Sequence, residues 1–82
     1  MKYRVWWWIK RGWGNREMEF RVVNSVEEAK KVLKRLASRD LKNKSITVNG
    51  GGLEVYNDED GDWEEYYDSL GRDIWEIIEE KE

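Results

Sequence analysis

The side chains that can do chemistry in this sequence are carboxylates, amines and indoles, because histidine and cysteine are both absent. Histidine is the usual general base, cysteine is the strongest side-chain nucleophile, and both are preferred ligands of transition metals. A carboxylate pair of the glycosidase kind, or a carboxylate site for Mg²⁺, still needs a concave pocket, which a chain of 82 residues rarely builds. The sequence therefore predicts a protein with no enzymatic activity and no cofactor.

Three aspartates at alternate positions, Asp58, Asp60 and Asp62, resemble the first ligands of a calcium loop. Counted from Asp58, however, Trp63 stands where the obligatory glycine belongs and Ser69 stands where the bidentate glutamate belongs. This pattern favours a solvated acidic loop, and we predict no metal site.

The glycine run Gly50-Gly51-Gly52 offers exposed N–H groups of the kind that bind anions. The lysine and the serine or threonine of a phosphate-binding loop do not follow it. We therefore interpret the run as an ordinary hairpin turn.

The first candidate binding surface is acidic and lies in the second half of the chain. Carboxylates that project together from a rigid helix imitate nucleic-acid phosphates and can occupy the basic groove of a nucleic-acid-binding protein. The alternative is that these charges only neutralise the basic first helix or keep the protein soluble. The candidate residues are Asp58, Asp60, Asp62, Glu64, Glu65, Asp68 and Glu76.

The second candidate surface combines aromatic and basic side chains near the amino terminus. Rings interleaved with cations are typical of single-strand binders, because bases stack on the rings while Lys and Arg hold phosphates. The alternatives are a homodimer formed sheet to sheet and a minor core under a loop. The overall negative charge counts against direct nucleic-acid binding. The candidate residues are Arg4, Trp6, Trp8, Lys10 and Arg21 on one sheet face, with Trp13 at the hairpin tip.

The sequence around the second surface predicts a hairpin followed by a helix. Residues 3–10 alternate between two faces, a turn at residues 11–15 supplies glycines and an asparagine, and Met18, Phe20 and Val22 continue the alternation. Ser25 and Glu28 have the capping-box spacing, and apolar residues follow at helical spacing through Ala37.

The sequence around the acidic surface gives a less regular pattern. We expect a short hairpin whose strands contain Ile46 and Val48 before the turn Asn49–Gly52, and Leu53, Val55 and Tyr56 after it. An acidic loop and a helix over 63–80 follow, with Gly71 as a kink or a break. A competing interpretation makes residues 63–68 a third strand that pairs with residues 53–57.

These elements predict one domain over residues 1–82 in the order ββαββα. Each element has one apolar side to bury, so the simplest architecture is α+β, a four-stranded antiparallel sheet with two helices packed on one face.

The chain is strongly bipolar although its net charge is only −3. Residues 1–53 carry 13 basic and 5 acidic side chains, and residues 54–82 carry 2 basic and 13 acidic ones, so the halves are +8 and −11. No apolar run approaches the roughly 20 residues that cross a bilayer, no signal sequence is recognisable, and cysteine is absent. We expect a cytoplasmic protein that does not bind membranes.

The acidic stretch over 57–68, NDEDGDWEEYYD, resembles in composition the small accessory proteins of phages and mobile elements, including anti-CRISPR inhibitors. The resemblance includes no diagnostic motif. It implies inhibition of a host nucleic-acid-binding protein. The leading hypothesis is thus a non-enzymatic inhibitor or modulator that presents its acidic surface to a basic groove. The alternatives are a single-strand-binding module and a structural homo-oligomer.

Overall fold

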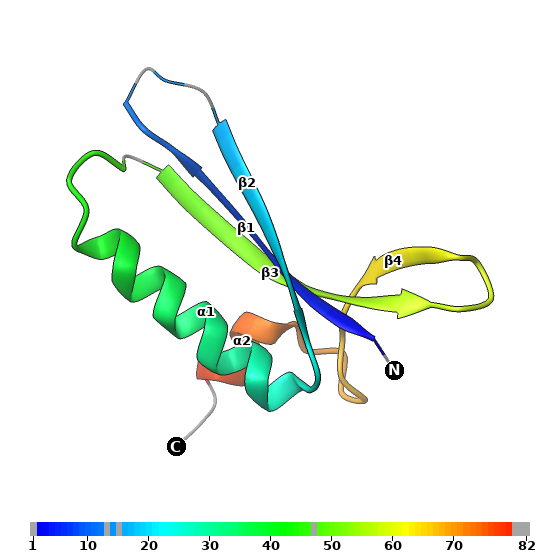
Figure 1. Cartoon of the computed structure of the whole chain (residues 1–82). Helices are drawn as coiled ribbons and strands as arrows, with labels where there is room; N and C mark the ends of the chain where they lie inside the picture. The colour runs from blue at the N-terminus through cyan, green and yellow to red at the C-terminus, as the bar shows by residue number, and fades with distance from the viewer. Residues whose placement is uncertain (1, 13, 15, 47, 80–82) are drawn as a thin grey trace.

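The computed structural model describes residues 2–12, 14, 16–46 and 48–79 and shows an α+β fold (Figure 1). Its antiparallel sheet has the strand order β2-β1-β3-β4. In chain order the elements are β1 (Tyr3–Lys10), β2 (Arg16–Val23), α1 (Val26–Leu41), β3 (Val48–Asn57), β4 (Asp62–Glu65) and α2 (Ile74–Glu79).

The first hairpin forms as predicted and has a regular register. Lys10 pairs with Arg16 across the turn, and Trp6 pairs with Phe20 further along. Residues that pair across an antiparallel ladder project to the same face. The even-numbered residues of β1 and β2 therefore share one face of the sheet.

Helix α1 begins at the predicted cap. The Glu28 N–H donates to Ser25 Oγ (3.1 Å), and the Glu28 carboxylate accepts from the N–H of Asn24 (2.8 Å). The return bond thus reaches the residue before the cap, not the cap itself as in a standard capping box. The helix continues through Leu41, four residues beyond the predicted apolar pattern.

The predicted turn at Asn49–Gly52 is wrong, because these residues lie inside the ten-residue strand β3. Strand β3 pairs with β1 without a break, and Gly50, Gly51 and Gly52 face Trp8, Trp7 and Trp6. A Cβ at Gly52 would lie only 2.8 Å from Trp6 Nε1, and one at Gly50 only 2.9 Å from Trp8 Nε1. The glycines therefore make room for indole rings beside the sheet.

The predicted helix over 63–80 is also wrong, and its first part is a strand, in agreement with the competing interpretation. Trp63 pairs with Tyr56 and Glu65 with Glu54, so β4 continues the sheet after a turn at Gly61, whose φ is 68°. The Trp63 and Tyr56 rings pack edge to face, with centroids 5.3 Å apart. Cross-strand aromatic packing thus outweighs the helical spacing of the apolar residues here.

Only the end of that apolar pattern is helical. The N–H of Glu76 donates to Asp73 Oδ1 (2.9 Å), and the N–H of Asp73 donates to Glu76 Oε1 (3.1 Å). This reciprocal capping box starts α2 just after Gly71, whose φ of 78° suits glycine.

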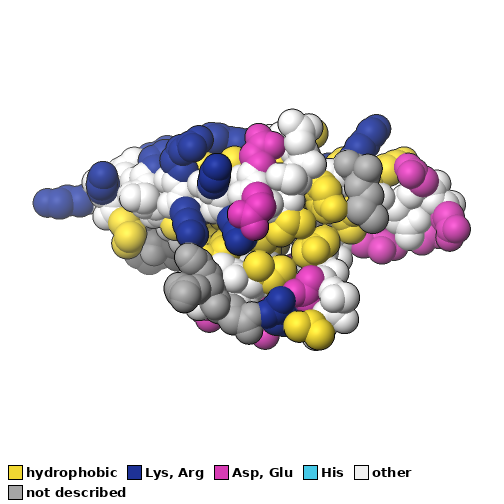
Figure 2. Space-filling view, turned by 90° about the horizontal axis from the view of Figure 1, so that it is seen from below, with side chains coloured by type: hydrophobic (Ala, Val, Ile, Leu, Met, Phe, Trp, Pro, Cys, Tyr) yellow, Lys and Arg dark blue, Asp and Glu magenta, His cyan; other side chains and the backbone are white. Residues whose placement is uncertain are grey.

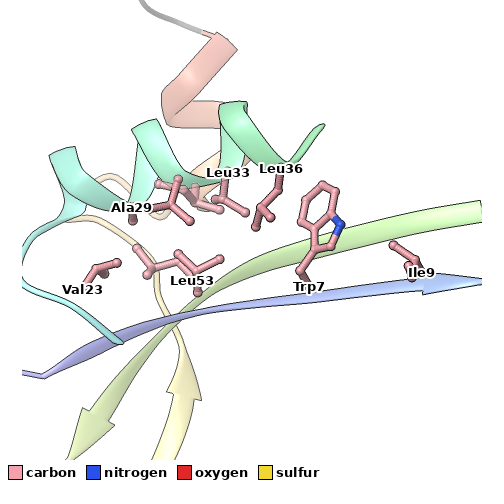
Figure 3. Packing of buried hydrophobic residues seen from close by; sticks show 10 residues of the cluster. Trp7, Ile9, Val23, Ala29, Leu33, Leu36 and Leu53 are labelled. Carbon is pink, nitrogen blue, oxygen red and sulfur yellow. The ribbon is translucent and has the colours of Figure 1, made fainter. Parts of the chain in front are cut away.

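The core lies on the face of the odd-numbered residues of β1 (Figure 3). Leu33 of α1 and Leu53 of β3 are fully buried, and Ile74 brings α2 into the same cluster. Trp7 is also buried, and its Nε1–H donates to the buried carboxylate of Asp40 at 2.7 Å. This bond satisfies both polar groups inside the core.

Candidate functional site

The candidate site is the sheet face opposite the core, named here the aromatic face. The strand registers place on it residues from all four strands. They are Arg4, Trp6, Trp8 and Lys10 of β1, Arg16, Met18, Phe20 and Val22 of β2, Glu54 and Tyr56 of β3, and Trp63 and Glu65 of β4.

Trp6 and Trp8 are half-buried because they lie beside glycine backbone. Each indole occupies space that a side chain at Gly52 or Gly50 would need. The rings are therefore held against β3 without entering the core. The structure brings these two tryptophans together with Arg4 and Lys10 on one face, as the sequence predicts.

Arg4 organises the middle of the aromatic face. Its guanidinium carbon lies 4.3 Å from the ring centre of Phe20 on one side and 4.3 Å from that of Trp63 on the other. Its Nε–H donates to Glu54 Oε1 at 2.6 Å. Cation–π stacking and this charge-assisted bond together connect β2, β1, β3 and β4 across the face.

Further cations flank the aromatic side chains. The Arg16 guanidinium carbon lies 5.1 Å from the ring centre of Trp8, and Lys2 Nζ lies 5.4 Å from that of Tyr56. Lys10 is exposed beyond Trp8. The β1 and β2 residues of this face include three cations and no carboxylate, so this half of the face is electropositive.

Strand β2 also exposes its apolar side chains on this face. The exposed fractions are 54% for Met18, 50% for Phe20 and 75% for Val22. Sequence reasoning assigned these residues to no surface, and it also missed Arg16, Tyr56 and Trp63. The available signal was the five-residue turn at 11–15, which pairs Lys10 with Arg16 and so sets the face of every later β2 residue.

One residue of the predicted aromatic surface lies on the other face of the sheet. Arg21 pairs with Val5, whose side chain is buried, so it projects to the core side of the sheet, contrary to the prediction. There it forms an ion pair with Glu19 at 2.9 Å. Trp13 lies outside the described residues.

The predicted acidic residues lie on the β3–β4 hairpin and on the segments that follow it. Asp58 and Asp60 are in the turn between β3 and β4, Asp62, Glu64 and Glu65 are in β4, and Asp68 and Glu76 belong to the loop and helix that follow. Figure 2 shows carboxylates at the end of the molecule formed by the β3–β4 hairpin, far from the Lys and Arg side chains along α1. The charge asymmetry of the sequence is therefore also an asymmetry in space.

Several of these carboxylates have structural partners. The N–H of Arg72 and the Arg72 guanidinium both donate to Asp68, which holds the pKa of Asp68 below its usual value. Glu76 caps α2 through Asp73, and Asn57 donates to Asp60 (3.2 Å) and Glu64 (2.8 Å). Burial, together with the nearby Asp73 and Glu54, raises the pKa of Glu65. The carboxylates thus do not form the helical array that the sequence predicts.

Comparison of the chain with models of known protein families, with curated proteins and with solved structures gives no match. Among the described residues no pocket is found and no cluster of acidic side chains could hold a metal ion. No helix in the described part of the chain is long and apolar enough to span a bilayer. The candidate site is therefore a surface, and its geometry alone supports the functional proposal.

Proposed function

We propose that this protein is a non-enzymatic binding module that holds single-stranded nucleic acid on its aromatic face. The observation that carries the proposal is that Trp6, Trp8 and Phe20 share one exposed sheet face with Arg4, Lys10 and Arg16. The proposal includes the prediction that both helices lie on the core side and leave this face uncovered.

Each part of the aromatic face has a role in this proposal. Bases stack on Trp8 and Phe20, which contributes about 1–3 kcal/mol per base. Lys10 and Arg16, which flank Trp8 at the hairpin end, contact the phosphates. Arg4 acts mainly by holding Phe20 and Trp63 in place, because it already has a carboxylate partner in Glu54.

The net negative charge of the chain is compatible with this proposal because of where the acids lie. The exposed carboxylates of the β3–β4 hairpin stand at one end of the molecule. Strands β1 and β2 present only cations among their charged residues on the aromatic face. A single-stranded nucleic acid that runs along β1 and β2 therefore contacts the electropositive half of the aromatic face.

The test is a fluorescence-anisotropy titration with a labelled single-stranded oligonucleotide of about 12 nucleotides, over a range of salt concentrations. We expect Trp8→Ala to weaken binding about tenfold or more, because one stacking ring is lost. Arg16→Glu should weaken binding and reduce the slope of log affinity against log salt by about 0.7, because one phosphate contact is lost.

The matched control is Arg35→Glu, which makes the same charge change on the exposed surface of α1. It should leave the salt slope within experimental error of the unchanged protein. Absence of binding at low salt would contradict the proposal, and so would an equal loss of affinity in Arg16→Glu and Arg35→Glu.

A second candidate function uses the acidic hairpin. Asp58, Glu59, Asp60, Asp62 and Glu64 are all exposed around the β3–β4 turn. We propose this hairpin, and no longer a helix, as the surface that an anti-CRISPR-like inhibitor would present to a basic groove in the cytoplasm. Affinity capture from a nuclease-treated lysate tests it: Asp58→Lys with Asp60→Lys should abolish capture of a protein that Arg16→Glu still captures.

A further inference from the structure

Strand β2 is an edge of the sheet, and its charged side chains, among them Glu19 and Arg21 on the core side, discourage pairing unless the partner strand complements them. In the part of the chain that the structure describes, its only neighbouring strand is β1, and eight consecutive residues keep a regular register with that neighbour. Proline, lysine and bulges commonly block edge strands, and β2 contains none of these. An edge of this length and regularity can accept another strand.

The direction of the β2 backbone groups follows from one hydrogen bond on the other side of β1. The N–H of Tyr56 donates to the carbonyl of Lys2 (2.9 Å), so even-numbered residues of β1 direct their backbone groups to β3. Odd-numbered residues of β1 then bond to their partners in β2, which include Glu19 and Arg21. The backbone groups of the even-numbered β2 residues are therefore directed to the free edge, and these residues are Arg16, Met18, Phe20 and Val22.

In one antiparallel register of β2 against a second β2, apolar residues face apolar residues on one side of the sheet and opposite charges face each other on the other side. If Phe20 lies on the two-fold axis, each Met18 faces a Val22 and each Glu19 faces an Arg21. Moving the register by two residues places either Glu19 opposite Glu19 or Arg21 opposite Arg21, which is unfavourable. The charges of the strand therefore select the register that also aligns its exposed apolar residues.

We propose that β2 pairs with β2 of a second copy of this chain, antiparallel and centred on Phe20. Each copy contributes a four-stranded sheet, so the dimer has one continuous sheet of eight strands. The two Phe20 rings meet on the aromatic face, where each is half-exposed in the single chain. The inference is independent of nucleic-acid binding, because it concerns the edge of the sheet and is tested without nucleic acid.

The experiment measures association by sedimentation equilibrium, with circular dichroism to confirm that each variant is folded. The unchanged chain should form a species of twice 9.9 kDa at about 0.1 mM. Glu19→Arg and Arg21→Glu should each raise the dimer dissociation constant about tenfold, because each places like charges opposite one another twice per dimer.

A mixture of the two variants tests the register itself. In a mixed dimer every reversed residue again faces an opposite charge, so the mixture should recover dimers that neither variant forms alone. Glu17→Arg is the matched control, because Glu17 faces Val23 in this register and its reversal should leave the dissociation constant within about twofold.

Three results would overturn the proposal. The first is an unchanged chain that stays monomeric at about 0.1 mM. The second is a mixture of Glu19→Arg and Arg21→Glu that fails to recover dimers although both variants are folded. The third is a dimer that Trp6→Ser dissociates and the charge reversals do not, because association would then use the face of the sheet and not its edge.

Discussion

The two faces of the sheet are built from alternate residues of the same strands, yet their aromatic side chains differ in burial. On the core face Trp7 is 2% exposed and its Nε1–H is bound by Asp40. On the aromatic face Phe20 is 50% exposed, and Trp6 and Trp8 are half-buried beside glycines. Of three successive tryptophans, the middle one is thus buried in the core and the two outer ones lie at the surface. This division means that aromatic content alone cannot distinguish a core face from a surface face.

Strand β2 shows the difference between the two faces most clearly. Its apolar residues Met18, Phe20 and Val22 project to the aromatic face, while Glu19 and Arg21 project to the side that contains the core. Glu19 is half-buried there and contacts Arg39 of α1 at 3.6 Å. Over residues 16–22 the hydrophobic pattern of β2 is therefore inverted relative to burial, which is costly for stability, whereas Val23 at the end of the strand is buried on the core side.

The largest expected difference between the faces is in free energy of unfolding. Leu33→Ala should lose about 3 kcal/mol, because Leu33 is completely buried and its truncation leaves a cavity. Val22→Ala should lose less than about 0.5 kcal/mol, because Val22 is 75% exposed. Urea unfolding at low micromolar concentration, where association contributes little, gives both values. Similar losses for the two variants would mean that the aromatic face is also covered.

A smaller difference is expected between neighbouring glycines of β3. A Cβ at Gly51 would overlap the Trp7 ring and the backbone carbonyl of Trp6, and neither can move easily inside the core. The three atoms nearest to a Cβ at Gly50 all belong to the Trp8 indole on the aromatic face, which can shift outward. We expect Gly51→Ala to cost about 3 kcal/mol and Gly50→Ala about 1 kcal/mol in the same measurement. The reverse order would contradict the assignment of the two faces.

The first half of the fold could be predicted because local signals agree there. The alternation over 3–10, the turn at 11–15 and the Ser25 cap all specify the same hairpin and helix that the structure contains. What sequence reasoning missed was the consequence of pairing Lys10 with Arg16, which moves Arg21 to the core side and Phe20 to the aromatic face. The apolar side chains of Met18, Phe20 and Val22 were expected to be buried, but the register with β1 determines which face of the sheet they lie on.

The second half could not be predicted because its local signals conflict with tertiary contacts. Three consecutive glycines indicate a turn in isolation, but next to Trp6, Trp7 and Trp8 they are the residues that fit. The spacing of Trp63, Tyr66 and Tyr67 indicates a helix, but Trp63 packs on Arg4 and Tyr56, and Tyr66 packs on Tyr3. Arg4 and Tyr3 are about 60 residues away from these partners in the sequence. Because residues 62–65 form a strand and not the predicted helix, the acidic side chains do not form the predicted array.

Two carboxylates that lie close in sequence should respond to pH in opposite directions. The pKa of Asp68 is lowered, mainly by the backbone N–H of Arg72, so its stabilising effect is present at neutral pH and is lost as pH falls through the folded-state pKa. The pKa of Glu65, on the aromatic face, is raised mainly by burial, so ionisation of Glu65 reduces stability as pH rises through the folded-state pKa.

The smallest expected effects are the changes in the free energy of unfolding caused by two conservative substitutions, which should have opposite signs. Glu65→Gln should increase the free energy of unfolding at neutral pH by less than about 0.5 kcal/mol, because it removes a partly desolvated charge beside Glu54 and Asp73. Asp68→Asn should decrease it, because the Arg72 side chain loses its anionic partner. Both differences should shrink at about pH 3, where the two carboxyls of the unfolded chain are protonated. Urea unfolding at the two pH values measures them. Loss of stability in Glu65→Gln at neutral pH would show that this carboxylate has a stabilising partner. Charge interactions on the aromatic face would then contribute more to stability than the structure indicates.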